Sequence, residues 1–213
     1  MCALDDNRRQ QQSRCVVLAC VGALAIAGCS TAPASRTPAR IEIQEEVGFT
    51  ITEKVRISGG VRTDYERALE LLEREQYEQG IELLKVVAEE APELSAPRID
   101  LGIALHRAGD LELAETNLQK ALELNPDHPI VHNELGIVYR KTGRFAEARD
   151  SYEKALAVYP GFHYARRNLA ILCDLYLADL TCAIEHYEAY IQTVPDDDEA
   201  TIWIADLRNR VGR

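Results

Sequence analysis

The chain has 213 residues, of which 46% are hydrophobic, and its 24 Lys and Arg against 35 Asp and Glu give a formal net charge of −11. This acidic balance argues against nucleic acid as a partner and against electrostatic adhesion to anionic lipid. The length fits one cooperative domain, and no second domain is apparent.

The first 28 residues have the pattern of a secretory signal. Three arginines within residues 8–14 precede an apolar run over residues 15–27. Spanning a bilayer takes about 20 apolar residues, so this run is too short for a transmembrane helix. It suits the central region of a signal peptide, which we predict over residues 1–28.

The end of this run indicates where the chain is attached. Ile26-Ala27-Gly28-Cys29 resembles the bacterial lipobox. The resemblance implies cleavage before Cys29, a diacylglyceryl group on its thiol and a further acyl chain such as palmitate on its amine, which together anchor stably. Ser30 follows, and in Gram-negative lipoproteins this favours the outer membrane, with the chain facing the periplasm. The alternative is an ordinary short signal or anchor in which Cys29 falls by chance.

Two segments separate this signal from the helical part. Residues 29–40 are rich in Ser, Thr, Ala and Pro without apolar periodicity, which is typical of a flexible tether. Residues 41–60 alternate apolar and polar side chains, as in Ile41-Glu42-Ile43, which predicts an extended, β-like arm. The arm either packs on the first repeat or adds as a strand to a partner's sheet.

A pattern of small and apolar residues then returns every 34 positions. Its members are Leu101, Gly102, Gly109, Ala114, Leu118, Ala121 and Pro126, followed by Leu135, Gly136, Gly143, Ala148, Tyr152, Ala155 and Pro160. A unit of this size cannot bury its own apolar face and must stack on copies of itself. Apolar spacing predicts two helices per unit, with a turn at Gly109 and a proline after the second helix.

These offsets resemble the tetratricopeptide repeat (TPR) family, whose pattern runs Leu-Gly, Tyr, Gly, Ala, Phe/Tyr, Ala, Pro. The resemblance implies an all-α TPR solenoid of about four helix-turn-helix repeats over residues 61–195. We place the repeats at residues 61–94, 95–128, 129–162 and 163–195, and a capping helix at 196–213. The cap begins with a run of carboxylates, which favours a helix N-terminus, and it shields the last repeat from water.

The first and fourth repeats depart from the pattern. The first has Arg67 in the Leu position and Gly80 in the second Ala position, and Thr63 and Glu66 have capping-box spacing for its first helix. The fourth lacks the turn glycine and needs one inserted residue to align Ala183. We therefore expect the fourth repeat to differ most in its packing.

Two thiols remain if the signal is removed and Cys29 is lipidated. Cys173 and Cys182 lie on the two antiparallel helices of the fourth repeat. A disulfide between them is one interpretation for an oxidising periplasm, and buried free thiols are the other. A metal site that uses Cys182 and His186 would need more ligands than the neighbourhood offers.

Catalytic motifs are missing from the sequence. It contains no HExxH motif, no Ser, His and acid constellation, and no glycine-rich phosphate loop. The histidines are scattered over helix ends and turns, and we interpret them as surface side chains: His106, His128, His132, His163 and His186. We predict no enzyme activity, no cofactor and no metal.

The family resemblance also implies a binding surface. TPR arrays coil so that the first helices of the repeats line a concave groove. The family's groove positions fall on Tyr65, Leu69, Leu72, Ile99, Ile103, His106, Asn133, Ile137, Arg140, Lys141, Tyr164, Arg167, Asn168 and Ile171. Isoleucine mostly replaces the asparagine that a carboxylate clamp would use, so an apolar or aromatic peptide or helix fits better.

Ile103, Ile137 and Ile171 recur at the repeat period and form either a ladder in this groove or inter-repeat core. Arg140, Lys141 and Arg167 form a local basic patch on an acidic protein.

A narrower resemblance concerns the fourth repeat and the cap. The segments 168–176 and 203–208 are similar to those of bacterial TPR proteins described as candidate components of TonB–ExbB–ExbD energy-transduction systems. The resemblance implies a periplasmic adaptor or scaffold that binds a protein of an envelope complex. Alternative roles are a pilotin-like factor for pilus or secretion assembly and a scaffold for peptidoglycan hydrolases.

Overall fold

A computed structural model describes residues 40–44 and 48–212 of the chain. The chain forms two compact units, one up to Lys54 and one from Val55 onward. The predicted signal peptide, Cys29 and the tether up to residue 39 fall outside the described residues.

The first unit contains a β-hairpin. Strands β1 (Arg40–Gln44) and β2 (Gly48–Thr52) pair antiparallel, with Ile41 opposite Ile51 and Glu42 opposite Thr50. The alternation in the sequence is therefore realised as two strands that pair with each other. Two isolated strands are marginally stable in water, and the role of this arm stays a prediction.

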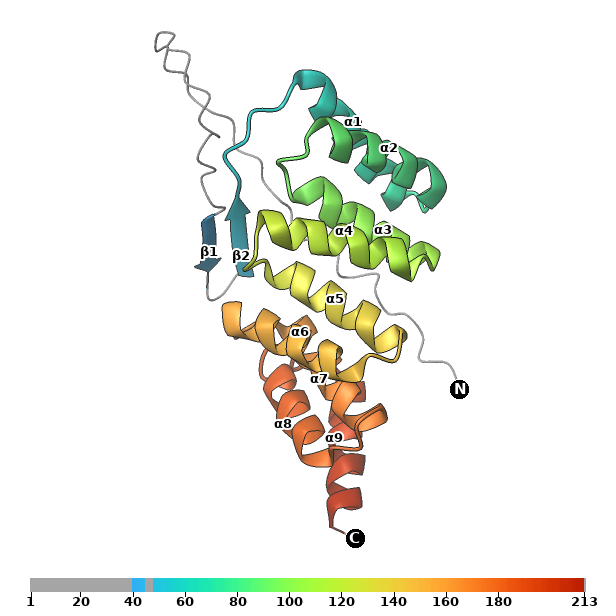
Figure 1. The fold of residues 1–213 in the computed structure, drawn as a ribbon. Coiled ribbons are helices and arrows are strands. Elements are labelled where there is room, and N and C mark those ends of the chain that lie inside the picture. Colours follow the sequence, from blue (N-terminus) through green and yellow to red (C-terminus); the bar gives the residue numbers. More distant parts are fainter. Residues whose placement is uncertain (1–39, 45–47, 213) are drawn as a thin grey trace. The chain divides into compact units, whose positions relative to one another are not determined.

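The regular elements in the described part of the second unit, residues 55–212, are helices joined by short turns. Its helices are α1 (Gly59–Glu73), α2 (Tyr77–Glu90), α3 (Ala96–Ala108), α4 (Leu111–Leu124), α5 (Pro129–Lys141), α6 (Phe145–Val158), α7 (His163–Leu175), α8 (Leu180–Ile191) and α9 (Asp198–Val211). Odd- and even-numbered helices pair within each repeat, successive pairs stack, and α9 packs on α8 (Figure 1). This is the predicted α-solenoid of four repeats with a capping helix.

Glycines let the two helices of a repeat touch. A Cβ atom on Gly136 would lie 2.4 Å from Cε1 of Tyr152, and one on Gly102 would lie 2.7 Å from a leucine of α4. The first repeat reverses the arrangement, because Gly80 on its second helix faces Leu72 on its first, at 2.6 Å from the added atom. Any larger side chain at these positions would force the helices apart.

The turn inside each repeat contains one residue in the left-handed region. Gly109 has φ 90° and Gly143 has φ 79°, whereas Glu75 has φ 61° and Ala178 has φ 53°. Glycine adopts this conformation without steric cost, but other residues do not. Ala178 thus takes the left-handed conformation of the missing turn glycine. It lies 35 residues after Gly143, one more than the repeat period, because of the inserted residue.

The start of the last helix, α9, agrees with the sequence prediction, whereas the start of the first helix, α1, does not. At the cap, the Asp197 side chain accepts a hydrogen bond from the Ala200 N–H at the start of α9. At α1, the prediction of a capping box at Thr63 was wrong. The helix begins at Gly59, and its N-cap is Ser58, five residues before Thr63. The Ser58 hydroxyl, in place of the Thr63 hydroxyl, accepts from the Val61 N–H.

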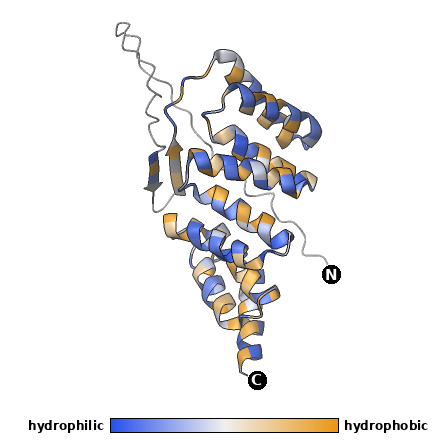
Figure 2. Ribbon diagram, viewed as in Figure 1, coloured by the Kyte–Doolittle hydropathy of each residue, from blue (hydrophilic) through white to orange (hydrophobic). Residues whose placement is uncertain are grey.

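Two large apolar clusters fill the solenoid, and α5 contributes to both. Leu135 and Val138 belong to the cluster of the first repeats, whereas Ile137 belongs to the cluster of α6–α9. Figure 2 shows hydrophobic and hydrophilic residues interspersed along each helix, as expected for amphipathic helices. No helix within the described ranges is both long and apolar enough to cross a bilayer.

Candidate partner-binding face

The first helices of the repeats form a continuous layer. Helix α3 contacts α5, and α5 contacts α7, although each pair is separated by an intervening helix in the sequence. We call the surface of α1, α3, α5 and α7 the first-helix face. It carries all of the residues that the sequence assigned to the groove.

These residues divide into three groups by exposure. Five are buried, namely Leu72, Ile99, His106, Asn133 and Ile137. Eight are half-buried, namely Tyr65, Leu69, Ile103, Arg140, Tyr164, Arg167, Asn168 and Ile171, and Lys141 is exposed. The half-buried and exposed residues are the ones that a partner can reach without any rearrangement.

The isoleucine ladder is therefore interrupted. Ile137 is 7% exposed and packs within the cluster of α6–α9. Ile103 and Ile171 lie against the edges of the two clusters and keep part of their surface in solvent. The structure assigns Ile137 to the inter-repeat core, whereas Ile103 and Ile171 can serve both core and surface.

Polar side chains connect consecutive first helices. The Tyr65 hydroxyl donates to Oδ2 of Asp100, joining α1 to α3. The Asn168 amide donates to Oδ1 of Asn133 at 2.9 Å, joining α7 to α5. Each pair lies 35 residues apart, one more than the repeat period. The two bonds therefore join the same two positions, offset by one residue, in successive first helices.

Two carboxyl groups on this face have pKa values above their ordinary range. Burial raises the pKa of Asp100 to about 6 and the pKa of Glu134 to about 7. Oε1 of Glu134 accepts from the Asn133 amide at 3.2 Å, and Oε2 lies 4.0 Å from Nδ1 of the buried His106. Glu134 is therefore partly protonated near pH 7, whereas Asp100 is mostly ionised.

The two arginines among the predicted groove residues, Arg140 and Arg167, rest on aromatic rings. The Arg167 guanidinium lies 5.5 Å from the Trp203 ring centre, and that of Arg140 lies 5.7 Å from the Tyr176 ring centre. Arg140 also donates to the Tyr152 and Tyr176 hydroxyls, at 3.4 and 3.5 Å. Neither guanidinium forms an ion pair with a carboxylate of the described residues. Positive charge thus remains available on this face.

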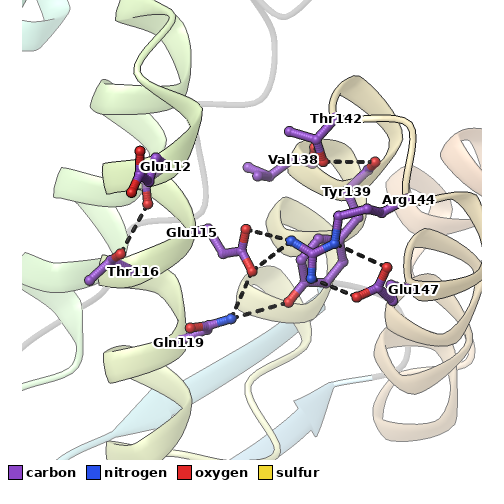
Figure 3. Close-up of polar contacts among 9 residues, drawn as sticks. All are labelled: Glu112, Glu115, Thr116, Gln119, Val138, Tyr139, Thr142, Arg144 and Glu147. Carbon is purple, nitrogen blue, oxygen red and sulfur yellow. Dashed lines mark hydrogen bonds and ion pairs between the residues drawn. The ribbon is translucent and has the colours of Figure 1, made fainter.

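Sequence reasoning missed the polar cluster around Arg144, which joins the second and third repeats. Figure 3 shows the Arg144 guanidinium between the carboxylates of Glu115 and Glu147. It contacts both oxygens of Glu115, at 2.9 and 2.7 Å, and stacks 4.2 Å from the Tyr139 ring centre. The three-residue spacing to Glu147 was visible in the sequence, but the contact with Glu115 of α4 depends on how the repeats stack.

The interpretation of the histidines as surface residues was wrong for three of them. His106, His128 and His132 are buried, with at most 8% exposure. Burial lowers the pKa of His128 to about 3, and its Nδ1 accepts from the Val131 N–H at the start of α5. The His132 Nε2 atom lies 2.8 Å from the Pro126 carbonyl oxygen, so His128 and His132 hold the turn between the second and third repeats. Within the described residues, no cluster of three or more His, Cys, Asp or Glu side chains could hold a metal.

The tetratricopeptide repeat family matches residues 93–161 and, in a second variant, residues 133–198. Solved structures with a similar fold include residues 41 to the end of MamA from Desulfovibrio magneticus RS-1. The identity is 22%, the match covers 74% of this chain and 88% of that one, and the TM-score is 0.66.

PilF of Pseudomonas aeruginosa is 21% identical over 70% of this chain and 68% of its own, with a TM-score of 0.64. YrrB, described as a TPR protein with an unusual peptide-binding site, is 21% identical over 66% of this chain and 72% of its own, with a TM-score of 0.58.

Such identities show the fold alone. Together, the family matches and the fold define a protein-interaction scaffold: residues 93–198 carry tetratricopeptide repeats, and the helical unit is a TPR α-solenoid. TPR domains typically bind proteins or peptides.

Proposed function

We propose that the chain is a lipid-anchored periplasmic adaptor that binds a peptide or helix of a cell-envelope protein complex through the first-helix face. The observation that carries this proposal is the combination of side chains on that face. Partly exposed Ile103 and Ile171 lie on the same layer of helices as Arg140 and Arg167, whose charges have no carboxylate partner in the described residues. Apolar area and available positive charge favour an amphipathic polypeptide.

Binding at this face is tested by adding charge where the surface is open. The double variant Ile103→Glu/Ile171→Glu should lose at least tenfold in partner capture, with unchanged helical circular dichroism. Leu113→Glu is the matched control, because Leu113 is 44% exposed on α4, a second helix. Ile137 is left intact, because a buried glutamate there would unfold the array. Equal losses in the test and control variants would contradict this face as the binding site.

Membrane attachment is supported by the lipobox that ends in Cys29. Cys29→Ala should move the protein from the membrane fraction to the soluble fraction, because the acyl chains supply the attachment and an acidic chain gains little from anionic lipid. A variant that stays in the membrane fraction after its signal peptide has been removed would exclude lipid anchoring at Cys29.

We further propose that the complex is a TonB-type energy-transduction system, on the likeness of residues 168–176 and 203–208 to TPR proteins described with such systems. In-cell crosslinking followed by affinity purification of the full-length protein should recover TonB, ExbB or ExbD subunits. Recovery of secretin subunits instead would support pilus or secretion assembly. Recovery of cell-wall hydrolases would support a peptidoglycan role, and either result would overturn the TonB assignment.

A further inference from the structure

The fourth repeat contains a disulfide with an arginine beside it. Cys173 of α7 and Cys182 of α8 are bonded, with their Cα atoms 5.9 Å apart, a separation within the usual range for disulfides. Arg149 of α6 places Nη2 3.4 Å from Sγ of Cys173 and 3.4 Å from Sγ of Cys182. One guanidinium nitrogen from the preceding repeat therefore faces both sulfur atoms.

The position of this guanidinium is fixed by a carboxylate. Nη2 of Arg149 also lies 3.1 Å from Oδ2 of Asp179. Asp179 is held in turn, because its Oδ1 accepts from the Cys182 N–H at 3.1 Å and caps α8. Nε of Arg149 is buried and has no hydrogen-bond partner in the described residues. The arginine is thus directed at the disulfide, and part of its donor capacity is unused.

The two sulfur-bearing residues differ in access. Cys173 is fully buried, whereas Cys182 is half-buried. An incoming nucleophile therefore reaches Cys182 first, and Cys173 supplies the leaving sulfur. A disulfide sulfur is a weak hydrogen-bond acceptor, but a thiolate accepts strongly from a guanidinium. The contact with Arg149 consequently strengthens when the bond breaks.

We propose that Cys173–Cys182 is a thiol–disulfide exchange site in which Arg149 stabilises the departing thiolate. The co-reactant is the thiolate of a small thiol or dithiol. It attacks Sγ of Cys182 and forms a new sulfur–sulfur bond, and the electron pair of the broken bond leaves on Sγ of Cys173 beside Arg149.

A second thiolate then attacks the co-reactant's sulfur and releases Cys182 as a thiolate. The net reaction reduces the protein disulfide to two thiols and oxidises two co-reactant thiols to a disulfide. A lower pKa of the leaving thiol speeds such exchange.

The rate of reduction of the folded, oxidised protein by dithiothreitol at pH 7 tests this role. Arg149→Gln should slow reduction at least threefold, Arg149→Lys should fall between that variant and the wild type, and the matched control Arg166→Gln should react like the wild type. Arg166 is a suitable control because it lies on α7 and donates to the Pro160 carbonyl instead. If Arg149 only packs the turn, its loss would loosen the repeat and speed reduction. An unchanged or faster rate in Arg149→Gln would therefore overturn the proposal.

A second measurement on the wild-type protein does not depend on the folding of any variant. Glutathione is added in excess, the mixture is quenched with acid at early times, and the mixed disulfide is located by mass spectrometry. The expected adduct is on Cys182. An adduct that forms first on Cys173, or only after the helical circular dichroism is lost, would contradict exchange in the folded state.

Discussion

The third and fourth repeats reach the same helix pairing by different local means. In the third repeat, Gly136 of α5 leaves room for the Tyr152 ring of α6, and Gly143 is the left-handed residue of the turn. In the fourth, the corresponding first-helix residue is Ala170, the left-handed residue is Ala178, and a disulfide ties α7 to α8. The repeat pattern thus requires that the two helices of a repeat pack closely. In the fourth repeat, which lacks the turn glycine, a disulfide helps to hold them together.

The largest effect should come from removing that bond. Cys173→Ser/Cys182→Ser should lower the free energy of unfolding by about 3 kcal/mol, because the short loop it closes no longer restricts the unfolded chain. Urea denaturation monitored by circular dichroism measures the loss, and reduced wild type should lose a similar amount. If the serine variant unfolds at the same urea concentration as oxidised wild type, the fourth repeat does not depend on its disulfide.

The third repeat should be most sensitive at Gly136. Gly136→Ala places a Cβ atom 2.4 Å from the Tyr152 ring and should cost about 2 kcal/mol by overpacking. Gly60→Ala is the matched control, because its added atom would meet only Ser58 Oγ, at 3.7 Å. Thermal denaturation of both variants is the measurement. Equal stability of the two would show that the helices of the third repeat can separate without penalty.

The two repeats also differ in charge at one position of their first helices. The third repeat has Glu134 there, and the fourth has Asn168, 34 residues later. Burial raises the pKa of Glu134 from 4.5 to about 7, so between these pH values the folded chain binds a proton that the unfolded chain has released. The free energy of unfolding should therefore fall by roughly 1 to 3 kcal/mol as the pH rises from 4.5 to 8.

Glu134→Gln should flatten this dependence, which urea titrations at several pH values would measure. Burial raises the pKa of Asp100 as well, so a shallower slope with the same sign should remain. A slope unaffected by Glu134→Gln would contradict a buried carboxyl at this position.

The smallest expected effects come from exchanging the turn residues. Ala178→Gly should raise the free energy of unfolding by roughly 1 kcal/mol, because glycine relieves the left-handed strain at φ 53°. Gly143→Ala should lower it by a similar amount, because it introduces that strain at φ 79°. Opposite signs in urea denaturation would confirm that the two turns are equivalent, and equal signs would contradict it.

The sequence predicted the helical repeats well because their determinants are local and periodic. Gly102 and Gly136 lie 34 residues apart, and each allows the two helices of its repeat to approach closely. The inserted residue of the fourth repeat was visible because Ala183 aligns one position late. Contacts that depend on stacking were not predictable in this way. The contact of Arg144 with Glu115 joins residues 29 positions apart, and the contacts of Arg149 with Cys173 and Cys182 join residues 24 and 33 positions apart, with no shared motif.

The predicted partner-binding residues show the same limit. Periodicity correctly placed Ile103, Ile137 and Ile171 on first helices, but it could not distinguish a core residue from a surface one. Ile137 is buried because the cluster of α6–α9 closes over it, whereas Ile103 and Ile171 stay partly exposed. The burial of His106 and His128 was missed for the same reason, since it arises from the packing of successive repeats.

The central claim, that the first-helix face binds a protein partner, is tested most directly by site-specific photocrosslinking in cells. A photoreactive phenylalanine analogue is placed at Ile103, at Ile171 or, as a control on a second helix, at Leu113. The account predicts that Ile103 and Ile171 crosslink to the same partner and that Leu113 gives no such product. A partner captured from Leu113 alone, or equally from all three positions, would contradict it.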